Sequence, residues 1–166
     1  MLNIGEKVGF LNPTLMLLKE YLPLSLQYKH SVPSIEAGVV VKMFVPTVTP
    51  PKYKRVIVVG LSPDGLQAAF VYINSKINKR VHCKRKAQKQ QKYLDSTNRD
   101  YLDRPSYVDC TQLVTIEKEK IINAVRKCPS QLLGWTSPYD FNLLKDSILG
   151  SPTIKGKYKN KFGFYA

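Results

Sequence analysis

The sequence has few of the residues from which metal sites and disulfide frameworks are built. Its 166 residues include three cysteines and two histidines, and no pair of cysteines has the CxxC spacing. These residues are Cys83, Cys110, Cys128, His30 and His82. An odd number of scattered cysteines argues against both a structural zinc site and a disulfide framework. We therefore expect no metal or other cofactor, and a reducing, cytoplasmic setting.

Long apolar runs and acidic residues are also scarce. No stretch approaches the ~18 apolar residues of a membrane-spanning helix, and the N-terminus lacks the pattern of a signal peptide, so we expect no membrane association. Lysine and arginine total 26 against 12 for aspartate and glutamate, which gives a net charge of +14. A surplus of this size favours polyanionic partners, and nucleic acid before other polyanions.

The positive charge is concentrated in two segments. Residues 76–92 carry +8 and residues 155–161 carry +4, with no acidic residue in either segment. The tail that begins with the second segment also contains Tyr158, Phe162, Phe164 and Tyr165, and rings among cations are typical of surfaces that bind single strands. We predict that nucleic acid binds the first segment and the lysines just before the second strand: Lys52, Lys54, Lys76, Lys79, Arg80, Lys84, Arg85, Lys86 and Lys89.

Three strand-like segments follow one another in the first half of the chain. Residues 38–45, 55–61 and 66–73 are rich in β-branched and aromatic residues, and a proline-rich loop is expected over 46–54. The turn signal Ser62-Pro63-Asp64-Gly65 separates the second and third segments, so they are predicted to pair as an antiparallel hairpin.

The second half of the chain mixes strands with short helices. Residues 76–103 have no clean apolar period and are predicted to be a long, mobile insertion. A strand-rich stretch is expected over 106–116 and an amphipathic helix over 117–127. Thr136 or Ser137 can cap a last helix, with Pro138 in its first turn and Gly150 at its end.

These elements suggest a mainly β (α+β) domain built on short antiparallel strands, either a strongly bent barrel or a compact α+β fold. The expected organisation has an N-terminal extension over 1–36, with a short helix from about Thr14 to Tyr21. The barrel domain covers 37–154, its basic insertion covers about 76–104, and a basic aromatic tail covers 155–166.

Familiar catalytic signatures are absent from the sequence. It has no P-loop, no GxGxxG, no GxSxG and no HExxH. Asp100 and Asp103 stand beside Arg99 and Arg104, and we expect these four to form an exposed ion-pair patch. His82 lies within the cationic run, which would keep it neutral, so it is a weak catalytic candidate.

Three motifs follow one another along the chain: Gly38-Val-Val-Val, then Lys54-Arg55-Val56-Ile57 after a proline-containing loop, then Tyr72-Ile73-Asn74-Ser75. The order of these motifs resembles the MazF/PemK (Kid) family of toxin-type endoribonucleases. The stretch 108–122 is similar to the strand-then-helix segment of that family. Two positions depart from the pattern: Val56 replaces a proline, and Lys76 follows Ser75 where a small residue is usual.

The resemblance implies an SH3-like barrel with short C-terminal helices, a homodimer, and metal-independent cleavage of single-stranded RNA. It implies catalytic roles for Arg55, which would stabilise transition-state charge and is also a candidate proton donor, and for Ser75, which would orient the scissile phosphate. It also implies a toxin-antitoxin or defence system in which an acidic antitoxin silences the enzyme. The alternative is a non-catalytic nucleic-acid-binding or structural protein of the same barrel class, acting in a larger assembly.

Overall fold

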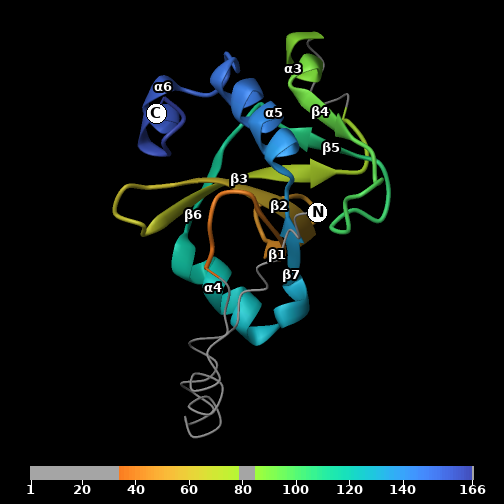
Figure 1. Ribbon diagram of the computed structural model, residues 1–166, viewed down its shortest axis with the longest axis vertical. Coiled ribbons are helices and arrows are strands. Elements are labelled where there is room, and N and C mark those ends of the chain that lie inside the picture. The colour runs from red at the N-terminus through yellow and green to blue at the C-terminus, as the bar shows by residue number, and fades with distance from the viewer. Residues whose placement is uncertain (1–33, 79–84, 166) are drawn as a thin grey trace, which may run out of the picture. The chain divides into compact units, whose positions relative to one another are not determined.

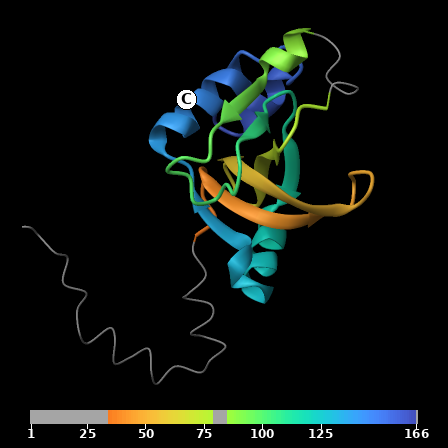
Figure 2. The same ribbon diagram turned by 90° about the vertical axis from the view of Figure 1, so that its right-hand side faces the viewer.

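The computed structural model describes residues 34–78 and 85–165, which belong to a unit that begins at Ser34. The expected N-terminal helix and His82 lie outside the described residues. The described part is mainly β: an antiparallel sheet curls into a half-barrel, and a few short helices accompany it (Figures 1 and 2). This confirms the expectation of a mainly β (α+β) domain with a strongly bent sheet.

Within the described residues, the sheet has the strand order β4-β5-β3-β2-β1-β7, and β6 also pairs with β3. Every neighbouring pair of strands is antiparallel. The strands are β1 (Val39–Val45), β2 (Lys52–Leu61), β3 (Gln67–Asn74), β4 (Gln91–Leu94), β5 (Ser106–Asp109), β6 (Val114–Glu117) and β7 (Leu132–Trp135).

The hairpin of β2 and β3 is the centre of the sheet, and it confirms the sequence prediction. Gly65 has a φ of 71°, a conformation that favours glycine, and closes the turn. The Asp64 carboxylate accepts hydrogen bonds from the Ser62 hydroxyl and from the backbone N–H of Leu66. Strand β2 begins at Lys52, earlier than predicted, so the proline-rich loop is shorter than expected.

The described helices are short: α3 (Arg85–Lys89), α4 (Lys118–Lys127), the 3₁₀ turn η1 (Pro129–Gln131), α5 (Pro138–Leu149) and α6 (Gly156–Lys161). The predicted boundaries of α5 are confirmed. The Ser137 hydroxyl accepts a hydrogen bond from the backbone N–H of Asp140, Pro138 occupies the first turn, and Gly150 is the C-cap. None of the described helices is long and apolar enough to span a membrane.

The core lies on the face of the sheet that α5 covers. Val40, Ile57 and Val71 from the three central strands are fully buried there, together with Leu144 and Ile148 of α5. The alternation of side chains along β2 points Ile57 toward α5, while its neighbours Val56 and Val58 are fully buried on the opposite face of the sheet. This packing holds the ends of β2 and β3 in place, and the candidate site lies at those ends.

The prediction of a long mobile insertion over 76–103 is wrong for much of its described part. Residues 91–94 form β4, which pairs with β5. Leu94, Tyr101 and Leu102 are buried in the core cluster. The apolar residues are too widely spaced to show a helical or strand period in the sequence, but each contributes to the common core.

The C-terminal segment is also not a free tail. Phe162 and Phe164 are buried in the core cluster, so their rings cannot stack on bases as predicted. The Lys159 ammonium is buried as well and donates to the backbone carbonyls of Leu149 (2.7 Å) and Ser151 (2.8 Å). Lys159, although part of the second basic segment, therefore stabilises the folded structure through these hydrogen bonds.

Gly60 allows the C-terminal segment to pack on β2, and we expect Gly60→Ala to destabilise the domain. A Cβ at this position would lie 2.5 Å from the carbonyl oxygen of Phe162, a backbone atom that cannot move aside alone. Overpacking of this kind typically lowers the free energy of unfolding by about 1–3 kcal/mol. Urea denaturation of Gly60→Ala and the wild type measures this change in the free energy of unfolding. Gly65→Ala, where nothing lies within 4 Å of the added Cβ but φ is positive, separates steric overlap from backbone strain. Equal stability of Gly60→Ala and the wild type would contradict the packing.

Candidate nucleic-acid interface

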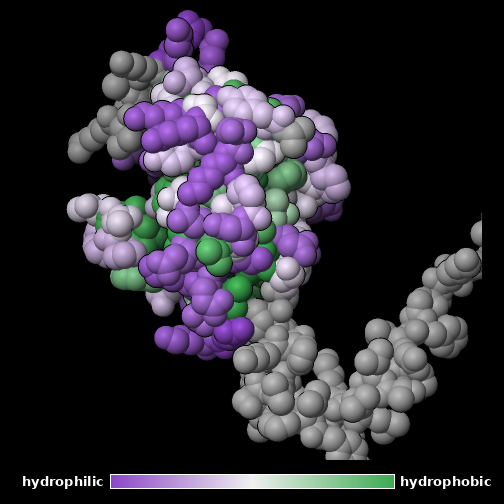
Figure 3. Space-filling model, turned by 90° about the vertical axis from the view of Figure 1, so that its left-hand side faces the viewer, coloured by the Kyte–Doolittle hydropathy of each residue, from purple (hydrophilic) through white to green (hydrophobic). Residues whose placement is uncertain are grey.

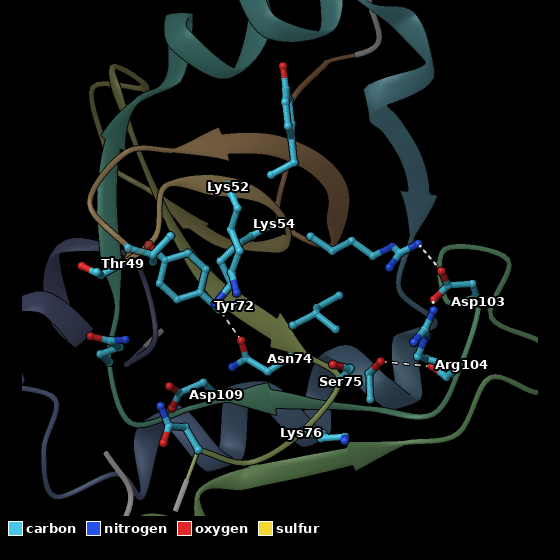
Figure 4. Close-up of a pocket in the computed structure, with 17 residues that line it drawn as sticks. Thr49, Lys52, Lys54, Tyr72, Asn74, Ser75, Lys76, Asp103, Arg104 and Asp109 are labelled. Carbon is cyan, nitrogen blue, oxygen red and sulfur yellow. Dashed lines mark hydrogen bonds and ion pairs between the residues drawn. The ribbon is translucent and has the colours of Figure 1, made fainter. Parts of the chain in front are cut away.

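The start of β2 and the end of β3 form a pocket of about 690 Å³. In an antiparallel hairpin these two segments lie at the same end of the sheet, which brings residues 52–55 beside residues 72–76. The loop 103–106 and the loop that contains Thr49 complete the wall. Figure 4 shows lysines, hydroxyl groups, amides and carboxylates converging on this space.

Arg55, the first predicted catalytic residue, lines this pocket. Its Nη2 atom lies 3.1 Å from Oδ2 of Asp103, and its side chain is 32% exposed. Its Nε atom is buried and has no hydrogen-bond partner among the described residues. The hydrogen bond from Arg55 lowers the pKa of Asp103 below its usual value. The guanidinium is thus oriented by one carboxylate and retains donor capacity for another oxygen.

Ser75, the second predicted catalytic residue, lines the same pocket. Arg55 pairs with Ile73 across the hairpin, and Ser75 follows Ile73 by two residues, just beyond the end of β3. In Figure 4 Ser75 lies on the side of the pocket nearer Asp103 and Arg104, with Lys76 next to it. Two residues far apart in the sequence are therefore brought to one pocket, as the prediction requires.

Lys54 has the most constrained ammonium of the pocket lysines. Its Nζ donates to Oδ1 of Asn74 at 2.7 Å and lies 4.3 Å from the centre of the Tyr72 ring. Burial, followed by the repulsion of nearby Lys52, lowers the pKa of Lys54 from its usual value. The ring and the amide hold this cation at a defined position, which suits it to a phosphate group.

The structure divides the predicted nucleic-acid-binding residues into two described groups. Lys52, Lys54 and Lys76 line the pocket. The second group, Arg85, Lys86 and Lys89, is exposed on α3 and does not line it. The remaining three, Lys79, Arg80 and Lys84, lie outside the described residues.

Sequence reasoning missed several polar and aromatic residues of the pocket. Tyr72 and Asn74 come from the end of β3 and lie on the same face as Lys54, which contacts both, so the antiparallel register with the predicted Lys54 could have indicated them. Asp103 and Arg104 had been expected to pair with their sequence neighbours in an exposed patch. The Arg104–Asp103 contact is present at 3.6 Å, but Asp103 also reaches Arg55. No local pattern indicates that contact.

A metal centre and a nucleophilic cysteine are two other kinds of reactive site. Among the described residues, no group of three or more histidine, cysteine, aspartate or glutamate residues is placed to hold a metal ion. Cys110 is fully buried in the core cluster, and burial raises the pKa of its thiol to about 12, which makes it a poor nucleophile.

The surface view in Figure 3 shows a face on which hydrophilic residues predominate, with hydrophobic patches near its middle.

Comparison with protein-family models finds no match to this chain, and comparison with curated proteins finds no similar sequence.

Proposed function

We propose that this protein is a metal-independent endoribonuclease of the MazF/PemK type that cleaves single-stranded RNA. The observation that carries the proposal is the convergence of Arg55, Ser75 and Lys54 on one pocket at the end of the central hairpin. Arg55 and Lys54 come from β2 and Ser75 directly follows β3, and together they supply cations and a hydroxyl group to the same space. A pocket of this composition is suited to the charged phosphate of an RNA backbone.

The proposal includes an SH3-like barrel, a homodimer and a cytoplasmic location. Its supports are the curled antiparallel sheet, the central hairpin and the short helices that follow the strands. It also includes regulation by an acidic antitoxin in a toxin-antitoxin or defence system. The net charge of +14 supports that part, because an acidic protein segment would be attracted to the same cations as RNA.

In the proposed reaction the ribose 2′-oxygen attacks the adjacent phosphorus and the bond from phosphorus to the 5′-oxygen breaks. Arg55 stabilises the negative charge that develops on the phosphoryl oxygens, and Ser75 orients the phosphate. Asp103, exposed beside Arg55, accepts the proton of the 2′-hydroxyl, and Lys54 donates a proton to the leaving 5′-oxygen. The products are a 2′,3′-cyclic phosphate and a free 5′-hydroxyl.

One observation favours the alternative, a nucleic-acid-binding or structural protein of the same barrel class without catalytic activity. Arg55 is already paired with Asp103 at 3.1 Å, so a phosphate would have to compete with a carboxylate for part of the guanidinium. In that case the pocket would bind the backbone of a polyanion and leave its bonds intact.

Incubation of the purified protein with single-stranded RNA in excess EDTA distinguishes these functions. We expect fragments with 2′,3′-cyclic phosphate and 5′-hydroxyl ends, identified by mass spectrometry. The same oligonucleotide with 2′-O-methyl groups should bind and remain intact, because it lacks the nucleophile. An Arg55→Ala preparation purified in parallel controls for contaminating nucleases. Binding of RNA without cleavage would support the alternative, and cleavage of the 2′-O-methyl strand would contradict the proposed mechanism.

A further inference from the structure

Two tyrosines face each other on the two strands at one edge of the sheet. Tyr93 of β4 pairs with Tyr107 of β5, and their ring centroids are 5.5 Å apart at an interplanar angle of 61°. Tyr93 is 55% exposed although it belongs to a strand. The family resemblance and the proposed function assign no role to either residue.

The pair lies on the face of the sheet opposite the core. Leu94 and Val108, the sequence neighbours of Tyr93 and Tyr107, are both buried in the core cluster. Because side chains alternate along a strand, the two tyrosines point to the other face. Their rings are thus placed at the surface by the same register that fills the core.

This face continues directly into the candidate pocket. Tyr107 pairs with Asn74 of β3, and Asn74 lines the pocket and accepts the hydrogen bond of Lys54. Lys54, Asn74, Tyr107 and Tyr93 therefore form a row across four neighbouring strands. Two strand spacings, about 10 Å, separate Asn74 from Tyr93. Figure 1 shows β4 and β5 side by side beneath α3, and Figure 4 shows Asn74 pointing toward Lys54.

The charges around the row suit an anionic strand. Arg85, Lys86 and Lys89 are exposed on α3, the helix that leads into β4, and Lys54 stands at the other end of the row. The nearby carboxylates are engaged: Asp95 pairs with Arg99, and Asp109 is buried and accepts from Gln91 and Thr111. An exposed ring, Tyr93, backed by the half-buried ring of Tyr107 lies between the cations of α3 and Lys54, and aromatic rings among cations are the arrangement with which proteins bind unpaired bases and their backbone.

We propose that Tyr93 and Tyr107 form a stacking subsite for a base of the single-stranded RNA whose phosphate occupies the pocket. The Tyr93 ring stacks on the base, Tyr107 supports that ring edge-on, and Lys54 binds the backbone. This inference rests on the proposed function in that it takes RNA as the ligand, but it concerns binding and does not require cleavage.

The test measures the binding of two ligands by fluorescence anisotropy. One is a short single-stranded RNA that carries 2′-O-methyl groups and therefore cannot be cleaved, and the other is an abasic oligonucleotide of the same length. We expect Tyr93→Ala to weaken binding of the strand that has bases by about 5- to 100-fold, and to leave binding of the abasic strand unchanged. Tyr93→Phe should retain wild-type affinity because it keeps the ring.

A matched control is Tyr139→Ala, which removes a tyrosine that is 75% exposed on α5 and should affect neither ligand. Lys54→Gln should weaken the binding of both ligands, because it removes a contact to the backbone of the oligonucleotide. Tyr107→Leu keeps an apolar side chain on β5 and should weaken binding of the oligonucleotide that has bases. A thermal unfolding experiment checks that this variant is folded.

The inference is overturned if Tyr93→Ala binds the oligonucleotide with bases as tightly as the wild type does, or if its affinity for the two ligands falls by the same factor. It is also overturned if the wild type binds neither ligand. Its failure is distinguishable from that of the proposed function. Cleavage of RNA with unchanged affinity in Tyr93→Ala overturns the stacking subsite alone. If Tyr93→Ala loses affinity only for the oligonucleotide with bases, and the wild type does not cleave RNA, the stacking subsite is supported and the proposed nuclease activity is overturned.

Discussion

Arg55→Ala is expected to slow RNA cleavage by about 100- to 1,000-fold, the usual effect of removing a group that stabilises transition-state charge. The guanidinium lines the pocket, and its buried Nε–H has no hydrogen-bond partner among the described residues. That donor gains a partner when negative charge develops on the phosphoryl oxygens. The rate of cleavage in EDTA at saturating RNA is the measurement, and a rate equal to that of the wild type would contradict the assigned role.

Arg55→Lys tests whether charge alone is sufficient. Lysine keeps the positive charge but lacks the planar fork of donors with which arginine can hold Asp103 and a phosphate together. We therefore expect Arg55→Lys to bind RNA and to cleave it much more slowly than the wild type. Stability should change little in these variants, because the Arg55–Asp103 ion pair is partly accessible to solvent, with side chains 32% and 51% exposed, and such pairs contribute at most about 1 kcal/mol.

Asp103→Asn separates the two roles that the carboxylate could have. Removing a negative charge beside Arg55 should strengthen RNA binding, since the phosphate no longer competes with a carboxylate. If Asp103 is also the proton acceptor, the rate at saturating RNA should fall in the same variant. A rate that rises together with affinity would show that Asp103 is only a counter-ion.

Arg99→Ala is expected to lower the free energy of unfolding by about 3–5 kcal/mol, since it leaves a buried carboxylate without its counter-ion. Arg99 donates from Nε to Oδ2 of Asp140 at 2.8 Å and from Nη2 to Oδ1 at 2.9 Å. The side chain of Asp140 is 2% exposed. The pair joins the loop that carries Asp103 to helix α5, so its loss should also reduce activity.

Urea denaturation measures this loss, and Arg126→Ala provides the matched control. Arg126 pairs with Glu119 at 3.2 Å on the surface of α4, where the two side chains are 35% and 61% exposed. An exposed pair of this kind contributes at most about 1 kcal/mol. Similar losses in Arg99→Ala and Arg126→Ala would contradict the structural role of the Arg99–Asp140 pair.

The Arg99–Asp140 pair also predicts how stability depends on pH. The hydrogen bonds from Arg99 lower the pKa of Asp140 below the usual value of about 3.9. The resulting stabilisation is complete above that usual value, and it is lost as the pH falls through the lower pKa of the folded state. The difference in stability between the wild type and Arg99→Ala should therefore narrow below about pH 4. A difference that stays constant down to pH 2 would contradict the cause of the shift.

Elements whose signals are local were predictable from the sequence. The Ser62–Gly65 turn and the flanking β-branched runs indicate the β2–β3 hairpin, because turn and strands are neighbours in the chain. Ser137 and Gly150 mark the ends of α5 through contacts within a few residues. The β7 strand was missed, since four residues after a proline-containing turn have no period of their own and pair only because β1 lies beside them.

The sequence by itself determined the excess of positive charge, the central hairpin and the capped helix α5, because each depends on composition or on contacts between near neighbours. Tertiary structure alone decided that Arg55 meets Asp103, that Arg99 reaches Asp140, and that Tyr93 and Tyr107 stand in line with the pocket. These contacts join segments separated by loops and strands, so they arise only when the sheet curls and its core packs. The residue types were visible in the sequence, but their partners depended on the closure of the fold.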